Sequence, residues 1–503
     1  MSKVIEEADW NPKPILRPGM DFHEDMAYFT IPLGRTSRKP GKGKDAEPTF
    51  VKEPATYVVT SDHHGFWYDE KDLELAGFLP SEQVYQERTP NWSLESAKAY
   101  LDGKAPTVLT KALFSEMRTV YTTYVEYADD IAYDLMALFV MYTYVFRLFE
   151  STGYVHFNGT AASGKSRNLA ILDVLAFNAV WASSMSAASL YRKLAGSPGT
   201  TCIDESEGFD GERGEELRRI LNAGYKDGAT AIRTEKTKND RYMPVEYEVF
   251  GPKALASINP LEPVIASRCV VIPMRPAIRQ LPDFTRRNPR WQELRDHLYV
   301  WALDNASALA ALTAEWHSES GKKQRLAPKL ISRQWETTAQ FVVLADYVGG
   351  EEFATKVIEW FNGYFVKQQK AADASDRLRT TLRALPRVLA SKQAYPGNMY
   401  SLKDIHEVIS GYLEEDQREY FKTKHVGKNL DTIGFRNKAR ATGGMRVELN
   451  EDAVRAEFTQ RQVEVMDEDK DWFEGKRSYQ NLTTEPDSDD PKWWDRDNGD
   501  EPA

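Results

Sequence analysis

The residues from Gly159 to Ser166 have the types and the spacing of a phosphate-binding loop. Its two glycines let the backbone fold back, so that successive N–H groups point into one concavity at a helix N-terminus. Lys165 would reach the β- and γ-phosphates, and Ser166 would offer its hydroxyl to Mg²⁺. The loop predicts a site for ATP and Mg²⁺, with a chance match in a Gly/Ser loop as the alternative. Its members are Gly159, Thr160, Ala161, Ala162, Ser163, Gly164, Lys165 and Ser166.

Acidic and amide side chains follow two further apolar segments. Segment 200–203 ends in Asp204 and Glu205, and segment 253–258 ends in Asn259. Neighbouring side chains on a strand point to opposite faces, so the two acids cannot share one role. We expect Asp204 to support Mg²⁺, Glu205 to polarise the water that attacks the γ-phosphate, and Asn259 to orient that water. The alternatives are exposed acids closing a strand and a simple Asn–Pro turn.

Arg268 stands at the entrance of a last apolar segment, 269–274. At that position it is poorly placed to reach the nucleotide of its own subunit. In a ring it would complete the site of a neighbouring subunit as an arginine finger. The alternative is a surface arginine paired with a carboxylate.

These side chains must be positioned by a sheet with helices around it. Segment 154–157 reads as a short buried strand before the loop, and 166–177 reads as a helix rich in Leu, Ile and Ala. With the strands at 200–203, 253–258 and 269–274, the chain predicts an α/β fold with a parallel sheet. Ligands of open α/β sheets collect at the carboxyl ends of such strands.

In the order of these motifs the chain resembles AAA+ ATPases. The segments 220–225, 250–256 and 266–274 are more specific and are similar to the helicase-like ATPase domains of phage and mobile-element primase-helicases. That family is related in layout to minichromosome-maintenance and superfamily III helicases. The resemblance spans roughly residues 92–460, and segment 335–350 also resembles the family beyond the core. The resemblance implies a hexameric, DNA-loaded motor. Members of that family often carry a primase domain upstream, but this sequence shows no polymerase-like set of carboxylates.

The resemblance gives two further segments an expected role. The β-prone runs 229–236 and 241–250 predict a hairpin, which in the resembled ring helicases projects into the central pore. Lys236, Lys238 and Arg241 would then grip the phosphates of a threaded strand, whereas a solvated charged hairpin is the alternative. Arg333 matches the family layout loosely, as a second sensor touching the γ-phosphate in cis.

The C-terminal third contains a second readable module. Helical patterns at 376–390, 402–412 and 424–433 precede two short strands, 435–440 and 445–449, which is the layout of a winged helix. Its basic residues predict contacts with DNA phosphates, with a purely packing role as the alternative. The expected contacts are Lys424, Lys428, Arg436, Lys438 and Arg440.

Composition points to a soluble machine of several domains, expected in the cytoplasm of a bacterial or archaeal host. The 503 residues include only two cysteines, Cys202 and Cys269, both expected in core strands. The segment 467–503 carries 13 acidic and 5 basic residues, so most of the net charge of −11 lies there. It is expected to be disordered and to act as a solubilising tail or as a docking segment for a partner. The apolar run 135–146 is too short for a membrane span and predicts a buried helix.

Together these features predict an ATP-driven DNA helicase or translocase that replicates a phage or a mobile element. The alternatives are an ATP-gated, origin-binding initiator or regulator and a DNA-independent protein-remodelling ATPase. The expected domains are a small β-rich domain (1–90), a helical linker (91–150), the ATPase core (151–280), a helical lid (281–372), the winged helix (373–464) and the acidic tail (465–503).

Overall fold

The structure is a computed structural model that describes residues 13–39, 49–81, 91–182, 186–204, 211–236, 242–318, 321–411, 413, 418, 421–442, 444–461, 463, 465 and 470–473. The predicted roles of Glu205, Lys238 and Arg241 concern residues outside these ranges. The chain divides into two compact units, Met1–Gly363 and Tyr364–Ala503.

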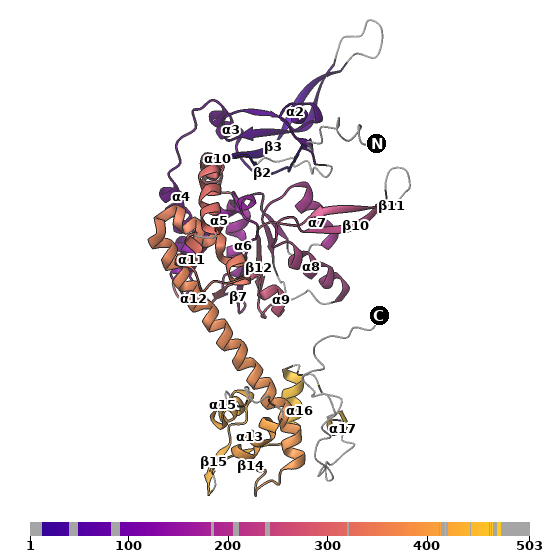
Figure 1. Ribbon diagram of the computed structural model, residues 1–503, viewed down its shortest axis with the longest axis vertical. Coiled ribbons are helices and arrows are strands. Elements are labelled where there is room, and N and C mark those ends of the chain that lie inside the picture. The colour runs from indigo at the N-terminus through magenta and orange to yellow at the C-terminus, as the bar shows by residue number, and fades with distance from the viewer. Residues whose placement is uncertain are drawn as a thin grey trace, which may run out of the picture. The chain divides into compact units, whose positions relative to one another are not determined.

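A parallel sheet lies at the centre of the first unit (Figure 1). Its described strands follow the order β13-β7-β12-β9-β8, and every pairing between neighbours is parallel. This arrangement confirms the predicted α/β fold with a parallel sheet. The strands are β7 (Tyr154–Gly159), β8 (Val180–Ala182), β9 (Thr201–Ile203), β12 (Lys253–Ser257) and β13 (Cys269–Met274).

Helices on this sheet supply its apolar packing. α6 (Lys165–Leu175) starts in the loop after β7 and packs against β7, β8, β9 and β12. A separate apolar cluster joins Tyr154 of β7 to Leu221 of α8 (Gly211–Ala223) and to α9 (Pro263–Ala266). β9 and β12 are wholly buried and the first four residues of β7 are buried, which explains why these strands read as continuous apolar runs in the sequence.

The predicted hairpin is present as the antiparallel pair β10 (Thr230–Lys236) and β11 (Tyr242–Glu248). It packs against α7 (Ala187–Gly196), where the rings of Tyr191 and Tyr247 lie 4.6 Å apart between centroids. Its tip lies outside the described residues.

The N-terminal segment forms a small β-rich structure that packs on the region around the parallel sheet (Figure 1). Phe29 contacts Phe177 and Tyr299 edge-on, at centroid distances of 5.5 and 5.3 Å. β3 extends to Lys39, where the described residues of this strand end. The elements are β1 (Ile15–Leu16), β2 (Met20–His23), β3 (Met26–Lys39), β4 (Thr49–Thr60), β5 (Gly65–Trp67), α2 (Glu70–Leu75) and β6 (Leu79–Pro80).

The predicted helical linker and lid are also helical in the structure. α5 is buried along nearly its whole length, which confirms the predicted buried helix. Among the described residues, no helix combines the length and apolarity needed to span a bilayer. α12 breaks at Gly350, where φ is 74°. The elements are α3 (Leu94–Leu101), α4 (Thr110–Tyr124), α5 (Ile131–Thr143), η1 (Phe146–Leu148), α10 (Arg290–His317), α11 (Lys322–Leu326) and α12 (Arg333–Ser391).

The second unit has its own apolar core, to which the predicted helices contribute Ile405, Val426 and Leu430. Its sheet has the order β14-β16-β15, so a strand that the sequence did not predict pairs with the hairpin. Trp472 in α17 is only 3% exposed and belongs to this core, so the predicted acidic tail begins later than residue 465. The elements are β14 (Met399–Ser401), α13 (Leu402–Gly411), α15 (Thr423–Ile433), β15 (Lys438–Ala441), β16 (Gly444–Glu448), α16 (Glu451–Gln460) and α17 (Lys470–Phe473).

Candidate nucleotide-binding site

The loop between β7 and α6 has the strained backbone of a phosphate-binding loop. Ala162 and Gly164 have positive φ values of 59° and 87°, which turn the chain back toward the start of the helix. Gly159 lies close to β13, because a Cβ atom there would come within 2.3 Å of the carbonyl oxygen of Met274. The first glycine is therefore required by close packing, and the second by backbone conformation.

Two polar groups of the loop are suited to an anionic ligand. The Nζ of Lys165 donates to the carbonyl oxygens of Gly159 and Thr160, at 2.7 and 2.8 Å, so the ammonium lies over the loop. The hydroxyl of Ser163 is buried and has no hydrogen-bond partner among the described residues. A buried group without a partner is costly unless a ligand satisfies it. A bound phosphate in the loop fits both groups.

The predicted Mg²⁺ ligands are brought together. Ser166 lies in the first turn of α6, and Asp204 directly follows β9. The Oγ of Ser166 donates to Oδ2 of Asp204 at 3.1 Å. A hydroxyl and a carboxylate are hard oxygen ligands of the kind that Mg²⁺ prefers beside phosphate oxygens. The residue after Asp204, Glu205, lies outside the described residues.

The segment after β12 is fixed at the same edge of the sheet. The side-chain amide of Asn158, near the end of β7, donates to the carbonyl oxygens of Ile258 and Asn259 at 3.0 and 3.1 Å. The hydroxyl of Ser257 donates to the carbonyl of Asn259 at 2.6 Å. These bonds hold the backbone of Asn259 beside the end of β7.

A pocket of about 370 Å³ continues from the loop to residues that sequence reasoning missed. On one side its walls include Tyr124, the last residue of α4, with Val125 and Glu126 after it, and on the other side the segment after β13. The carboxylate of Glu126 accepts from the backbone N–H groups of Ile278 and Arg279, at 3.2 and 3.0 Å to Oε2, and so joins the two walls. No motif marks these residues in the sequence, because they are defined only by the approach of distant segments.

A buried hydrogen-bond chain connects one pocket wall to the phosphate loop. The side-chain amide nitrogen of Asn168, in α6, donates to the carbonyl of Gly164 at 3.1 Å. The Oδ1 of the same residue accepts from the hydroxyl of Tyr127. Asn168 is fully buried, and burial, as the largest cause, raises the pKa of Tyr127 well above its usual value, so the phenol stays a donor. The sequence offered no signal for this pair.

The two candidate arginines lie together. The guanidinium carbons of Arg268 and Arg333 lie 4.8 and 4.6 Å from the centroid of the Tyr225 ring. Burial lowers the pKa of Arg268, and the like charge of Arg333 lowers it further. Arg333 also pairs with Glu336 at 3.2 Å, and Arg268 donates to the carbonyl of Asn222 at 3.2 Å.

This arginine pair lies at the amino ends of the strands, opposite the phosphate loop. The carbonyl of Arg268 accepts from the N–H of Tyr154, the first residue of β7, and the loop begins after Gly159, its last residue. Five strand residues at about 3.3 Å each separate the two ends by about 16 Å. The structure therefore does not bring Arg333 to the phosphates of its own chain, which differs from the cis role predicted for it.

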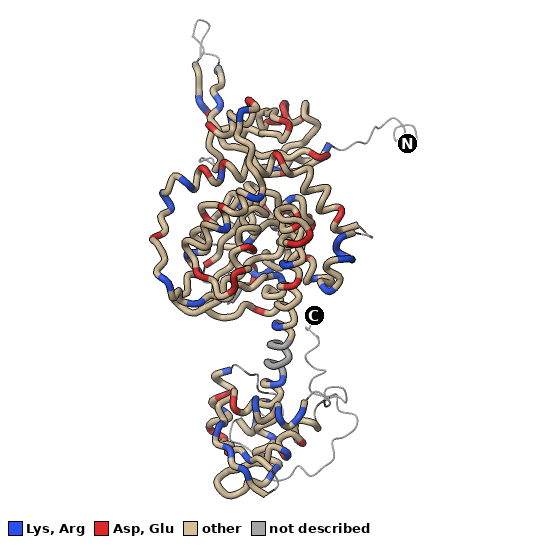
Figure 2. The backbone as a smooth tube through the Cα atoms, turned by 90° about the vertical axis from the view of Figure 1, so that its left-hand side faces the viewer, with Lys and Arg blue, Asp and Glu red and all other residues tan. Residues whose placement is uncertain are grey.

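The basic residues predicted to contact DNA have different surroundings. Lys236 is exposed at the end of β10, and Lys424, Lys428, Arg436 and Arg440 are exposed in the second unit. Lys438 instead turns inward, because its Nζ pairs with Asp431 at 2.6 Å and donates to the carbonyl of Gly427 at 2.7 Å. Figure 2 shows that Lys and Arg recur along the described chain of this unit.

The two cysteines are free and buried, as predicted, and burial raises the pKa of both thiols. In the part of the chain that the structure describes, no group of three or more His, Cys, Asp or Glu residues is placed to hold a metal ion.

No protein-family model matches the chain, and no curated protein sequence matches it. Similar solved structures include a full-length MCM homolog from Methanopyrus kandleri, an apo form of the NrS-1 C-terminal region and the SCCmec type IV Cch active helicase. Their sequence identities are 11%, 13% and 10%, and their TM-scores are 0.33, 0.29 and 0.31. The alignments cover 67%, 79% and 75% of this chain and 77%, 94% and 74% of the others. Scores this low do not establish a shared fold.

Proposed function

We propose that the protein is an ATP-hydrolysing DNA translocase, with helicase activity, that works as a ring. The observation that carries the proposal is the meeting of Lys165, Ser166 and Asp204 at the carboxyl ends of β7 and β9. A lysine, a hydroxyl and a carboxylate at a phosphate loop are the parts that phosphoryl transfer from a nucleoside triphosphate requires.

In this proposal each of these residues has its own role in ATP hydrolysis. Lys165 and the loop N–H groups bind the phosphates, while Ser166 and Asp204 hold the Mg²⁺ that neutralises the charge on them. Glu205 takes the role of water activator, and Asn259 that of orienting the water. The pocket beside Tyr124 has the size to receive the nucleoside part of ATP.

The arginine pair supports a site shared between subunits. Arg268 and Arg333 lie about 16 Å along the strands from the phosphate loop of their own chain, so only a second copy brings them to phosphates. A head-to-tail contact of this kind is heterologous and makes a ring where its rotation closes, and we propose that it closes as a hexamer. Both arginines would then act in trans on the developing charge.

DNA is the proposed polymer, gripped without sequence choice by the β10–β11 hairpin. Lys236 is exposed on this hairpin together with Ile232 and Tyr242, which are 57% and 70% exposed. Cations interleaved with exposed aromatic and apolar side chains suit a single strand, whose phosphates and bases are both accessible. Replication of a phage or mobile element in a bacterial or archaeal cytoplasm is the proposed setting.

The second unit favours one other candidate, an ATP-gated initiator that binds duplex DNA. Exposed Lys424 and Lys428 lie on α15, and Arg440 lies on the neighbouring strand β15. In a helix-and-hairpin module such cations position a duplex through its phosphates. Sequence-specific duplex binding without strand separation would favour this candidate.

The test is ATP turnover of the full chain with and without single-stranded DNA, together with unwinding of a forked duplex. The proposal expects turnover that rises with DNA and falls to background in Lys165→Ala. Turnover that DNA leaves unchanged, with no unwinding, would reject the DNA motor in favour of a regulator or a protein-remodelling ATPase.

A further inference from the structure

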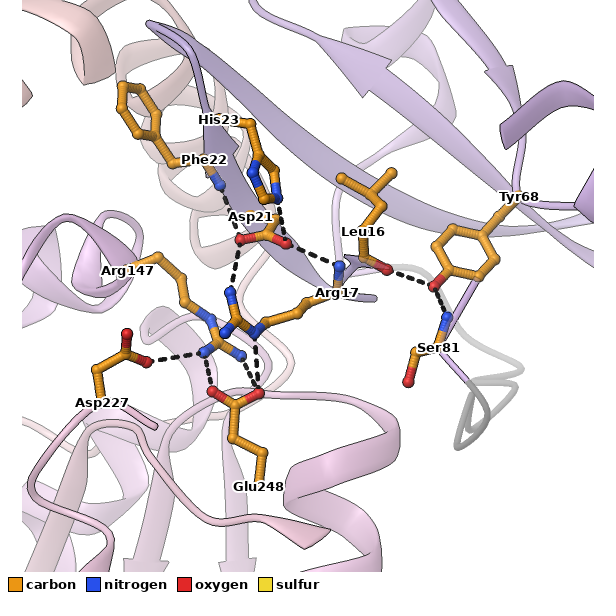
Figure 3. Close-up of polar contacts among 10 residues, drawn as sticks. All are labelled: Leu16, Arg17, Asp21, Phe22, His23, Tyr68, Ser81, Arg147, Asp227 and Glu248. Atoms are coloured by element: carbon orange, nitrogen blue, oxygen red, sulfur yellow. Dashed lines mark hydrogen bonds and ion pairs between the residues drawn. The ribbon is translucent and has the colours of Figure 1, made fainter. Parts of the chain in front are cut away.

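The two ends of the β10–β11 hairpin meet at a cluster of charged residues (Figure 3). Glu248 is the last residue of β11 and pairs in the ladder with Thr230, the first residue of β10. Asp227 lies three residues before β10. We call Asp227 and Glu248 the foot of the hairpin. A rigid hairpin pivots at its foot, so contacts there control how it moves.

Arg147, which follows α5 in η1, binds both sides of the foot. Its side chain is 2% exposed, and its guanidinium reaches both carboxylate oxygens of Glu248, at 3.2 Å for the Nη2–Oε2 pair. It also lies 3.6 Å from Asp227. The rings of Phe146 and Phe250 flank it, with centroids 5.2 and 6.0 Å from the guanidinium carbon. A buried bidentate pair of this kind is geometrically specific.

Arg17 brings the N-terminal structure to the same carboxylate. Its Nε donates to Oε2 of Glu248 at 3.1 Å, across 231 residues of sequence. On its other side, its backbone N–H donates to Asp21 at 2.8 Å and its Nη1 lies 3.5 Å from the same carboxylate. His23 contacts Asp21 at 3.0 Å. Glu248 therefore receives one arginine from the core and one from the N-terminal structure.

The N-terminal side of this link is fixed to the molecule. Asp21 is 1% exposed; burial alone would raise its pKa, but the His23 hydrogen bond, the charge of Arg147 and the bonds from Arg17 together lower it. Next to Arg17, the hydroxyl of Tyr68 donates to the carbonyl of Leu16 at 2.5 Å. The backbone and the side chain of Arg17 are therefore both fixed by hydrogen bonds and ion pairs to the N-terminal structure.

We propose that Arg17 is a positioning residue through which the N-terminal structure holds the foot of the hairpin and couples DNA contact to ATP turnover. The inference rests on the proposed function, since it assigns a use to the hairpin that would grip DNA. In this arrangement Arg147 fixes the foot to the ATPase core, and Arg17 fixes it to the N-terminal structure. Motion of the hairpin therefore strains or breaks the Arg17–Glu248 pair.

The variant Arg17→Gln tests this link with little risk to folding. The Arg17 side chain is 36% exposed, and its loss leaves Glu248 paired with Arg147 and Asp21 bonded to His23, so no buried charge is left alone. Lys13→Gln is the matched control, because Lys13 is a cation of the same structure whose Nζ lies 3.7 Å from the exposed carboxylate of Glu74 and donates to the Glu74 carbonyl at 3.1 Å. Arg17→Lys retains the positive charge, so it should lose less of the DNA stimulation of ATP turnover than Arg17→Gln.

Two measurements on the full chain judge the proposal. Amide hydrogen exchange in β10 and β11 should be faster in Arg17→Gln than in Lys13→Gln. Basal ATP turnover should be unchanged, while the stimulation by single-stranded DNA falls at least about fivefold, the lower range for coupled sites. Exchange and stimulation equal to those of Lys13→Gln would overturn the coupling role of Arg17. A wild-type protein whose turnover ignores DNA would instead overturn the proposed function, and the coupling with it.

Discussion

At the residue scale, the account depends on a few oxygen and nitrogen atoms around the phosphate loop. Ser166 and Asp204 are 38 positions apart and meet at 3.1 Å. A site whose ligand-binding groups already lie together needs little rearrangement to bind. Because the side chains are already in place, single substitutions can test the role of each one.

Asp204→Asn should lower ATP turnover by about 100-fold, because the amide can still accept from Ser166 but lacks the charge that favours Mg²⁺ near the phosphates. Binding of ATP without Mg²⁺ should change little. The measurement is turnover and nucleotide affinity across a Mg²⁺ titration. Asp102→Asn, which alters an exposed acid paired with Lys104 at 3.1 Å, is the control. Wild-type turnover in Asp204→Asn would refute its assignment.

Tyr127→Phe should raise the KM for ATP several-fold with a smaller change in kcat. The substitution leaves Oδ1 of Asn168 buried without its donor, at a cost of about 1–3 kcal/mol, and loosens the amide that holds the Gly164 carbonyl. Tyr121→Phe is the control, because the neighbouring Tyr121 hydroxyl is equally buried but has no hydrogen-bond partner among the described residues. An equal KM for ATP in both variants would show that the chain from Tyr127 to the loop does not position it.

At the element scale, the strands that carry the site were the readily predicted part. Local apolar runs with a polar residue at the end predict β7, β9 and β12 because both faces of these strands are buried. The same reasoning could not find β14, since its partner β16 is more than 40 residues away and its own sequence is short. It also could not foresee that Lys438, one of three alternating cations, bonds inward to Asp431.

One buried lysine makes the stability of the protein depend on pH. As an ammonium, Lys253 at the start of β12 donates to the carbonyls of Gly224, Val249 and Gly251 at 3.0–3.1 Å. Burial lowers its pKa to about 7, and above that value the neutral amine keeps two N–H donors for these three carbonyls. Between that value and its ordinary pKa of 10.5, the unfolded chain binds a proton that the folded protein does not. Its contribution to stability is therefore lowest below pH 7 and grows as the pH rises.

Urea unfolding at pH 7 and pH 9 should show this contribution. The free energy of unfolding of the wild type, relative to Lys253→Met, should increase by up to about 1.4 kcal/mol per pH unit. The variant is expected to be less stable overall, since three carbonyls lose their donor, so the slope with pH is the informative quantity. Lys71→Met, on the exposed side of α2, is the control. Parallel pH curves for wild type and Lys253→Met would contradict a neutral lysine in the folded state.

At the scale of the whole molecule, sequence reasoning found the segments of the candidate nucleotide site but not the contacts that connect distant parts of the chain. It placed Arg268 at the entrance of the last strand, and in the structure Arg268 directly precedes β13. It did not foresee that Arg333 shares the Tyr225 ring with Arg268, or that Arg17 reaches Glu248. These contacts join residues more than 40 positions apart, and only the folded chain brings them together.

Because the arginine pair lies away from the phosphate loop of its own chain, mixing two inactive variants can test whether subunits share a site. Arg268→Ala keeps the phosphate loop but lacks the arginine, whereas Lys165→Ala keeps the arginine but lacks the loop lysine. Each variant alone should be nearly inactive. In a ring, the junction between the two variants contains one complete site.

The decisive measurement is DNA-stimulated ATP turnover of Arg268→Ala and Lys165→Ala, alone and mixed in equal amounts. A shared-site ring motor predicts that the mixture regains a substantial part of the wild-type rate, since about a quarter of randomly formed junctions are complete. A mixture no more active than the sum of its two components, or an Arg268→Ala protein that is fully active by itself, would contradict it.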